Sequence, residues 1–356
     1  MKKALVAMSG GVDSAVAALL LKRGGYDLTG ITMRLWNDGE DIPDAFSCPP
    51  DENAIEAKKI AELLGFEHLT TALGHSFKKE VVDRFVSDYA LGKTPNPCVE
   101  CNRALKFGAL FDIAAKLDIP YLATGHYAKI EQDENGRFLL KKGADNAKDQ
   151  SYFLWSIKKE HLPFILFPLG DFSKPQIREL AQENGFNNAS RSDSQDICFV
   201  PDGEYVSFIE KYCGRNDSFK CGNFVSPDGE ILGKHQGLVR YTVGQRKGLG
   251  IAVGRPIFVG GKDPITNTVL LCSDRELYKT ELYASRVNVL TDESFDTPVK
   301  LEAKIRYRHT PALASVERCA DGRLHVVFDE PQRAIAPGQS VVFYDGDTVV
   351  GGGIID

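Results

Sequence analysis

The segment Ser9-Gly10-Gly11-Val12-Asp13-Ser14 has the residue types of an anion-binding loop. It follows a short apolar run at residues 4–8 and precedes a stretch of helical character at 15–22. Its glycines allow backbone conformations in which successive N–H groups converge on an anion, and a helix N-terminus adds partial positive charge. Ser9 and Ser14 add hydroxyl donors. We therefore predict a phosphate site here, although a serine–glycine turn that caps a helix is the plainer alternative.

The sequence SGGVDS lacks the lysine of a Walker loop and instead resembles the PP-loop of ATP pyrophosphatases. The resemblance implies that ATP adenylates a substrate oxygen and that pyrophosphate is released. Because Asp13 would repel the phosphates unless a cation lies between them, we also expect Mg²⁺ near Asp13.

A second group with chemical potential consists of cysteines. Cys98 and Cys101 form a CxxC within TPNPCVECN, residues 94–102, and Cys198 follows about a hundred residues later. The prolines predict a stiff loop ahead of a helix that begins near Arg103, and a nearby helix N-terminus would lower a thiol pKa. A single CxxC is weak evidence for zinc, which normally needs four ligands. The remaining cysteines are expected to be packed or surface thiols; they are Cys48, Cys213, Cys221, Cys272 and Cys319.

Alternating strands and helices must position these groups. Apolar runs predict strands at 4–8, 28–35, 68–73 and 121–124, and helical spacing occurs at 15–22, 53–64, 77–91 and 103–117. This order predicts an α/β domain with a mainly parallel sheet, helices on both faces and ligands at the carboxyl ends of the strands. His126 follows one such end, although a core or capping histidine explains it equally well.

Beyond residue 200 the sequence changes character. Short β-rich runs separated by glycines predict a small all-β domain or barrel; they lie at 222–225, 237–243, 256–259, 269–271, 286–290, 299–308, 324–328 and 340–344. We place the domains at 1–203, 204–266 and 267–356. Lys304, Arg306 and Arg308 would alternate along a strand and share one face, turned toward RNA phosphates or merely toward water.

Composition excludes some classes of protein. The chain has 356 residues, of which 43% are apolar and 26% charged, as in ordinary globular proteins. Its net charge of −6 argues against a nucleic-acid binder with a wholly basic surface, but allows a local basic face. No apolar run approaches the ~20 residues that cross a bilayer, and the N-terminus does not have the pattern of a signal peptide. We therefore expect a cytoplasmic protein that has no membrane partner.

Six motifs occur in order over residues 9–250; they are SGGVDS, TPNPCVECNRALKF, ATGHYAK, KDQSYFLW, SQDICFVP and YTVGQRKGLG. Together they resemble the tRNA-specific 2-thiouridylase family of the MnmA type. The resemblance implies ATP-dependent replacement of the C2 oxygen by sulfur in the wobble uridine, position 34, of lysine, glutamate and glutamine tRNAs. It implies a persulfide or sulfide donor, such as a cysteine desulfurase relay. It also implies an adenine nucleotide alpha hydrolase-like PP-loop domain, a small central domain and a C-terminal β-barrel that contacts tRNA.

The resemblance further assigns site residues. Cys101 matches the nucleophile and Cys198 the persulfide carrier. The ATP site matches Ala7, Met8, Ser9, Gly10, Gly11, Val12, Asp13, Ser14, Met33 and Gly125. The site for the tRNA anticodon loop matches Asn96, Pro97, Cys98, His126, Lys148, Asp149, Gln150, Arg306, Tyr307 and Gln339.

Cys98 departs from the family pattern, because many members have an aspartate there that is thought to transfer a proton. A thiol, with a reference pKa of about 8.5 against about 3.9 for aspartate, does not replace that acid easily. One alternative is that Cys98, Cys101 and Cys198 hold a 4Fe–4S cluster with one iron open to sulfide, as in related sulfur-transfer enzymes. Another is that Cys98 is a spectator or a disulfide partner. The sequence leaves these alternatives open.

Two other functions also stay open. A PP-loop ligase or amidotransferase that acts on a small metabolite would explain SGGVDS, but not the cysteines or the β-rich tail. A non-catalytic tRNA- or metal-binding protein would not need a complete nucleotide loop.

Overall fold

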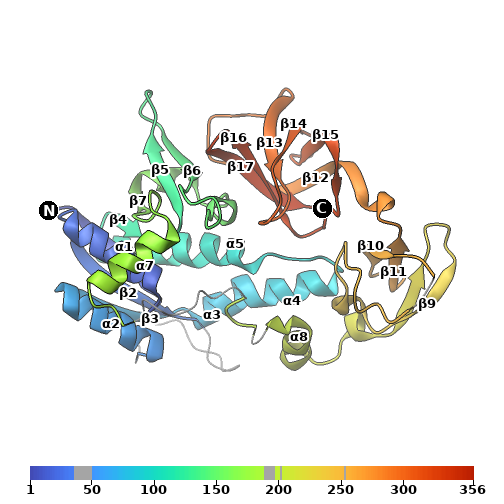
Figure 1. Cartoon of the computed structure of the whole chain (residues 1–356), viewed down its shortest axis with the longest axis horizontal. Coiled ribbons are helices and arrows are strands. Elements are labelled where there is room, and N and C mark those ends of the chain that lie inside the picture. Colours follow the sequence, from blue (N-terminus) through green and yellow to red (C-terminus); the bar gives the residue numbers. More distant parts are fainter. Residues whose placement is uncertain (36–49, 188–196, 201–202, 252–253) are drawn as a thin grey trace.

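The structure is a computed structural model that describes residues 1–35, 50–187, 197–200, 203–251 and 254–356 (Figure 1). Cys48 lies outside the described residues, as do Ser194 to Asp196 and Pro201 of the motif SQDICFVP. No helix in these ranges is long and apolar enough to cross a membrane.

The N-terminal domain is built on a five-stranded parallel sheet with the order β3-β2-β1-β4-β7. The strands are β1 (Lys3–Ala7), β2 (Asp27–Arg34), β3 (Glu67–Ala72), β4 (Tyr121–Ala123) and β7 (Ile165–Leu166). Successive residues of β1 face opposite sides, so that Ala4 and Val6 join one hydrophobic cluster while Leu5 joins another. The predicted parallel α/β domain is therefore confirmed.

Helices cover both faces of this sheet. On one face lie α1 (Val12–Arg23), α2 (Glu52–Leu64) and α7 (Lys174–Glu183). The other face packs against two longer helical segments with π-helical turns in their middle. The first comprises α3 (Gly74–Phe77), η1 (Lys78–Val82) and α4 (Asp83–Ala90), and the second comprises α5 (Pro97–Cys101), η2 (Asn102–Ala109) and α6 (Leu110–Lys116).

The central part of the chain forms a four-stranded sheet with the order β10-β11-β8-β9. It follows α8 (Tyr205–Cys213) and η6 (Asp217–Phe219), and its strands are β8 (Gly222–Val225), β9 (Ile231–His235), β10 (Phe258–Asp263) and β11 (Thr268–Cys272). The strand expected at 237–243 is wrong, because a short helix, η7 (Leu238–Arg240), occupies this stretch. Gly237 has φ of 109°, which takes the chain out of an extended conformation and brings it against the Ser218 carbonyl.

The C-terminal part is an antiparallel barrel, as the sequence predicted. Its strands are β12 (Tyr278–Val289), β13 (Val299–Lys304), β14 (Ala312–Arg318), β15 (Leu324–Arg333), β16 (Ser340–Asp345) and β17 (Thr348–Ile355), preceded by η8 (Arg275–Leu277). They have the order β12-β15-β14-β13-β16-β17, and β12 also pairs with β17, which closes the barrel.

The N-terminal domain adds two strands to the barrel sheet. The hairpin β5 (Ala128–Gln132) and β6 (Phe138–Lys142) pairs with β17 where Lys141 meets Thr348, and it stands beside the barrel in Figure 1. The turn η3 (Ser151–Phe153) packs there as well: the indole of the nearby Trp155 donates to Ser340 Oγ at 3.0 Å. The barrel is thus docked on the N-terminal domain through a sheet extension and buried hydrogen bonds.

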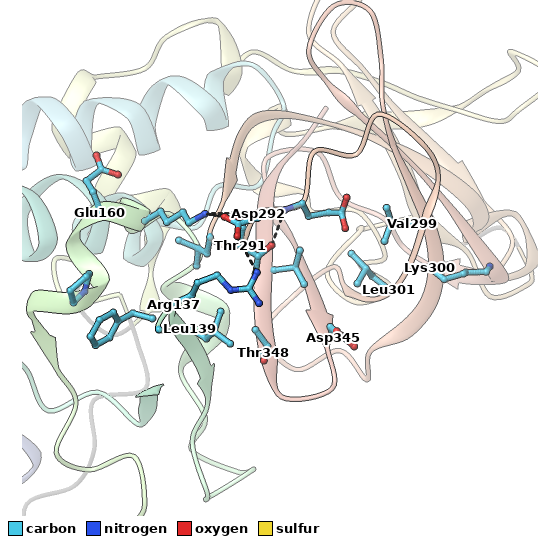
Figure 2. Close-up of a pocket in the computed structure, with 17 residues that line it drawn as sticks. Arg137, Leu139, Glu160, Thr291, Asp292, Val299, Lys300, Leu301, Asp345 and Thr348 are labelled. Atoms are coloured by element: carbon cyan, nitrogen blue, oxygen red, sulfur yellow. Dashed lines mark hydrogen bonds and ion pairs between the residues drawn. The ribbon is translucent and has the colours of Figure 1, made fainter. Parts of the chain in front are cut away.

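A cavity of about 860 Å³ lies between the barrel, β6 and η4 (Lys159–Phe164), and Figure 2 shows residues that line it. Arg137 contacts Asp292 at 3.0 Å across it, and Lys159 also pairs with Asp292. Its lining includes no cysteine and no residue of the SGGVDS loop. We therefore assign this cavity to the domain interface and not to the reaction.

Candidate functional site

The SGGVDS loop connects β1 to α1 in a compact turn. Ser14 Oγ donates to the Gly11 carbonyl at 3.0 Å and accepts from the Ser9 N–H at 3.2 Å. Gly10 has φ of +72°, and a Cβ there would lie 2.8 Å from the Asn53 carbonyl oxygen. A larger residue at position 10 would therefore deform the loop.

The residues predicted for ATP meet at one edge of the sheet. Ala7 ends β1, Met33 lies near the end of β2, and Gly125 follows β4. A Cβ on Gly125 would lie 2.8 Å from the Asp13 carbonyl carbon, so this glycine permits close contact with the loop. Carboxyl ends of parallel strands are where α/β folds bind their ligands.

Asp13 is already paired with a lysine that the sequence did not single out. Lys174 Nζ lies 2.8 and 2.9 Å from the two carboxylate oxygens of Asp13, and the Tyr127 hydroxyl donates to Oδ1 at 2.7 Å. The Lys174 side chain is only 8% exposed. The contacts of Asp13 thus place an ammonium where we expected Mg²⁺.

The cysteines do not lie in a loop ahead of a helix, as predicted, but within the helix that begins at Pro97. Asn96 caps this helix, since its side chain accepts from the Cys98 N–H at 3.2 Å. Pro97 occupies the first helical position, where an N–H would have no acceptor within the helix, so a proline there costs no hydrogen bond. Cys98 is exposed and Cys101 is partly buried on this first stretch of helix.

The thiol pKa values are also opposite to the expectation. Burial raises the pKa of Cys98 and of Cys101, and burial together with the other two thiols raises the pKa of Cys198 to about 12. Cys98 and Cys198 reach solvent, yet the surrounding protein still disfavours their thiolates. Cys98 contributes to the raised pKa of Cys101, and both contribute to that of Cys198, so the three thiols lie close enough for their charges to interact.

Lys106 lies near all three thiols, and its positive charge opposes the increase in their pKa values that burial causes. Its charge lowers the pKa of Cys98, Cys101 and Cys198. It lies in η2, on the same helical segment as the CxxC. In sequence, Lys106 lies within the motif TPNPCVECNRALKF, where its residue type and spacing do not mark it for a role.

His126 is buried beside Lys106. Lys106 Nζ lies 3.2 Å from His126 Nε2, and Thr124 Oγ1 lies 2.7 Å from Nδ1. Because an ammonium can only donate, Nε2 accepts and Nδ1–H donates to Thr124. Burial, followed by the charge of Lys106, holds the pKa of His126 well below its usual value. As placed, His126 is a neutral acceptor that orients Lys106.

Phe199 anchors the segment that carries Cys198. The centroid of its ring lies 5.5 Å from the ring centroid of Phe77, 5.3 Å from that of Phe85 and 5.2 Å from that of Phe208, in edge-to-face contacts. These contacts fix Cys198 against α3 and α4, next to the helix with the other thiols. Within the described ranges, no group of three or more His, Cys, Asp or Glu side chains is arranged so that it could hold a metal ion.

Two of the predicted tRNA residues are engaged inside the protein. Asp149 is buried and accepts from the N–H groups of Gly143 and Ser151 at 3.0 and 3.1 Å. Gln150 Oε1 accepts from the Tyr127 N–H at 2.9 Å. Lys148, directly before them, is partly exposed.

The predicted basic strand is wrong beyond Lys304, where β13 ends. Beyond this point Ile305 is buried, Arg306 donates to the Arg333 carbonyl at 3.1 Å, and the ring centroid of Tyr307 lies 4.5 Å from that of Phe153. The alternating face of Lys304, Arg306 and Arg308 is therefore absent from this stretch.

Gln339 also contacts the protein itself. Its amide donates to the Thr94 carbonyl at 2.7 Å, just before the segment of Asn96 and Pro97 that we expect to meet the target base.

Comparison with known proteins identifies the family of this chain. Family models match residues 2–202 as a "tRNA methyl transferase HUP domain", 206–273 as a "tRNA methyl transferase PRC-barrel domain" and 279–355 as an "Aminomethyltransferase beta-barrel domain". The chain is 45% identical to the tRNA-specific 2-thiouridylase MnmA of Clostridioides difficile (strain 630), over 100% of this chain and 98% of that protein. It is 46% identical to the MnmA of Acetivibrio thermocellus, over 99% of each. The chain belongs to the tRNA-specific 2-thiouridylase family, MnmA.

Proposed function

We propose that this protein uses ATP to replace the C2 oxygen of the wobble uridine, position 34, by sulfur in lysine, glutamate and glutamine tRNAs. One observation carries the proposal: Gly125 contacts the nucleotide loop, and the next residue, His126, holds Lys106, which faces the three thiols. The ATP loop and the thiols therefore share one edge of the sheet. Two of the matched family models are described as methyl transferase domains, but this pairing suits adenylation followed by sulfur transfer.

The wobble uridine is accessible to such a site because it is already single-stranded. Its C2 oxygen attacks the α-phosphate of ATP, pyrophosphate leaves, and the oxygen becomes part of a phosphate ester. This activation is needed because an amide-like oxygen is a poor leaving group.

Sulfur then arrives as a persulfide on Cys198. The terminal sulfur attacks C2, and AMP leaves with the oxygen. The Cys101 thiolate attacks the Cys198 sulfur, so that the S–S bond breaks and its electron pair stays on the sulfur bound to C2. The product is 2-thiouridine together with a Cys101–Cys198 disulfide, which an external thiol must reduce. The mutual influence of these thiols supports their approach.

The cofactors follow from the residues that are present. The contacts of Asp13 with Lys174 suit a site where Lys174 faces the phosphates, and Mg²⁺ would bind together with them. The described thiols do not fit a 4Fe–4S cluster, and we derive no step through one. We infer a cytoplasmic reaction supplied by a persulfide relay, such as that of a cysteine desulfurase.

The proposal is tested by pyrophosphate release. Purified protein with ATP should release pyrophosphate when unmodified lysine, glutamate or glutamine tRNA is added, and not with a tRNA that has another wobble base. Release that needs no tRNA would instead indicate a ligase or amidotransferase for a small metabolite.

Cys98 is expected to act as the proton-transfer group of the site. Because burial raises the pKa of its thiol, Cys98 holds a proton at neutral pH, and the same burial favours the protonated form of an aspartate at this position. Cys98→Asp should therefore keep thiolation within about tenfold of the wild-type rate, while Cys98→Ser should lose about a hundredfold, the scale of general acid catalysis. The measurement is 2-thiouridine formation by anaerobically prepared, iron-free protein. Loss of activity in Cys98→Asp, together with an iron requirement of the wild type, would favour the cluster.

Arg306 is expected to contact the tRNA backbone. Arg306→Gln should weaken tRNA binding and flatten its log–log salt dependence by about one unit, because one phosphate contact is lost. Lys300→Gln is the matched control, since Lys300 is an exposed cation of the same barrel that pairs with Asp329. An unchanged slope in Arg306→Gln would mean that Arg306 serves only its bond to Arg333.

A further inference from the structure

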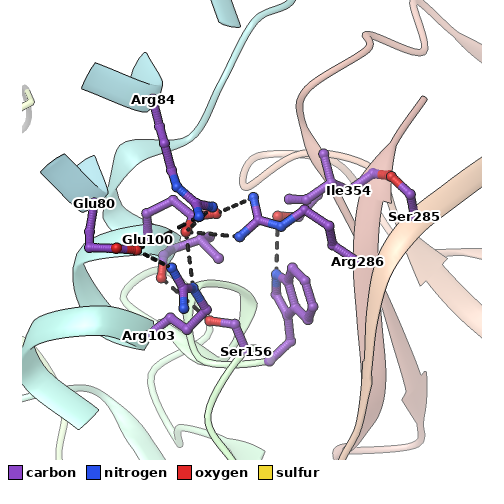
Figure 3. Close-up of polar contacts among 11 residues, drawn as sticks. Glu80, Arg84, Glu100, Arg103, Ser156, Ser285, Arg286 and Ile354 are labelled. Atoms are coloured by element: carbon purple, nitrogen blue, oxygen red, sulfur yellow. Dashed lines mark hydrogen bonds and ion pairs between the residues drawn. The ribbon is translucent and has the colours of Figure 1, made fainter. Parts of the chain in front are cut away.

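Glu100 lies between the two cysteines of α5, and its carboxylate is almost buried, with 11% of the side chain exposed. Figure 3 shows three arginines that converge on it. Arg103 Nε lies 3.0 Å from Oε2 and Arg84 Nη1 lies 3.4 Å from the same oxygen. Both belong to the same domain as Glu100, and Glu80 pairs with Arg103 at 2.9 Å. An arrangement of this kind fixes the rotation of the helix that carries the thiols.

The third arginine, Arg286, comes from β12 of the C-terminal barrel. Its Nη1 lies 2.7 Å from Glu100 Oε1, and its Nη2 lies 3.0 Å from Oε2. This is the two-pronged geometry that a guanidinium forms with a carboxylate and that a lysine cannot reproduce. The contact therefore joins the barrel directly to the CxxC helix.

The backbone of β12 is distorted at this position. Arg286 has φ of +50°, in the left-handed region that residues other than glycine rarely occupy. The pairing of β12 with β17 also shifts register between Ser285 and Asn288. A bulge turns a side chain out of the regular alternation of a strand. Here the bulge directs Arg286 out of the barrel and toward Glu100 (Figure 3).

A second contact from the barrel holds the other end of the cysteine segment. The Thr94 N–H donates to the Pro337 carbonyl at 2.8 Å, and the Gln339 amide donates to the Thr94 carbonyl at 2.7 Å. A Cβ on Gly338 would lie 3.0 Å from the Thr94 nitrogen, so the two backbones are in close contact. The barrel thus contacts the chain on both sides of Cys98, at Thr94 and at Glu100.

The charge of Glu100 depends on this contact. Burial alone would raise the pKa of its carboxyl, but the hydrogen bond and charge of Arg286, followed by Arg103, hold that pKa below its usual value. Glu100 is therefore ionised at neutral pH and available to all three arginines.

We propose that Arg286 is a positioning residue for sulfur transfer: through Glu100 the tRNA-contacting barrel sets the place of Cys98 and Cys101. This inference rests on the proposed function for its catalytic consequence, but the placement itself is independent of it. The barrel is then part of the sulfur-transfer site and not only a docking surface for tRNA.

The test compares Arg286→Ala with Arg84→Ala, which removes an arginine from the same carboxylate without touching the barrel. Arg286→Ala should lower kcat for thiolation about a hundredfold, the cost of a misplaced reacting group, with the KM for tRNA unchanged. Arg84→Ala should lower kcat much less, and Arg286→Lys should retain only part of the wild-type kcat. Glu100→Gln combined with Arg286→Ala should be no worse than Glu100→Gln alone, because both changes break one contact.

A second readout needs neither ATP nor tRNA. In Arg286→Ala the loosened helix should expose Cys101, so that iodoacetamide alkylates it several times faster than in the wild type. The global unfolding transition, measured by circular dichroism, should be the same in both proteins. Should Arg286→Ala fail to fold, the same measurement is made with Arg286→Lys. Equal alkylation in Arg286→Lys and wild type, or equal loss of kcat in Arg286→Ala and Arg84→Ala, would overturn the proposal. If the wild type does not thiolate tRNA but alkylation still changes, the positioning holds and the proposed function is wrong.

Discussion

Replacing Cys198 with serine is expected to abolish thiolation while adenylation continues. A hydroxyl cannot carry a persulfide, so 2-thiouridine formation should fall by about four orders of magnitude, as when an enzyme loses its nucleophile. Pyrophosphate release should persist, because the SGGVDS loop is untouched. The two activities are measured in one reaction, by nucleoside mass spectrometry and by pyrophosphate assay.

Cys221→Ser is the matched control, since this cysteine is also exposed but belongs to the central part of the chain. It should retain both activities. Thiolation by Cys198→Ser at the wild-type rate would show that sulfur reaches the uridine by a route that does not use this thiol.

Lys106→Met is expected to have the second-largest effect. Lys106 lowers the pKa of Cys98, Cys101 and Cys198. Its removal should therefore raise these three pKa values and reduce the thiolate fraction at neutral pH. We expect thiolation to fall about a hundredfold to a thousandfold, as when a preorganised electrostatic group is removed. The specific readout is the pH profile of Cys101 alkylation, which should move to higher pH and reach the same rate once the thiol is fully ionised.

Lys106→Arg keeps the positive charge, so its pH profile of Cys101 alkylation should be close to that of the wild type. If Lys106→Met had the alkylation profile of the wild type, Lys106 would have only a structural role beside His126.

The N-terminal domain could be predicted well because its signals are local. A buried strand, a glycine pair and a helix follow one another within residues 3–23, so one stretch of sequence determines the strand–loop–helix unit. The end of α2 at Gly65, which has φ of +71°, is a local signal of the same kind.

The start of the cysteine helix was missed although its signals are local too. Pro95 and Pro97 predict a stiff loop, whereas Pro97 is compatible with a first helical turn that Asn96 caps. The thiol pKa values are raised and not lowered because the protein that surrounds this helix buries the thiols, which no local sequence signal indicates.

The charged partners could not be predicted, because they come together only in the fold. Lys174 is 161 residues from Asp13, and Arg286 is 186 residues from Glu100. In sequence, each is an ordinary lysine or arginine with no spacing that marks it. The pairing of Lys141 with Thr348, which joins the N-terminal hairpin to the barrel, is likewise a contact between distant segments.

The most direct test of the whole account is 2-thiouridine formation at position 34. Purified, iron-free protein is incubated with an unmodified glutamate tRNA, ATP and a persulfide donor, and the digested tRNA is analysed by mass spectrometry alongside pyrophosphate. We predict 2-thiouridine at this position only, with one pyrophosphate released for each sulfur inserted and none without ATP. Unmodified tRNA at the end of the reaction, or sulfur inserted without ATP consumption, would contradict the account.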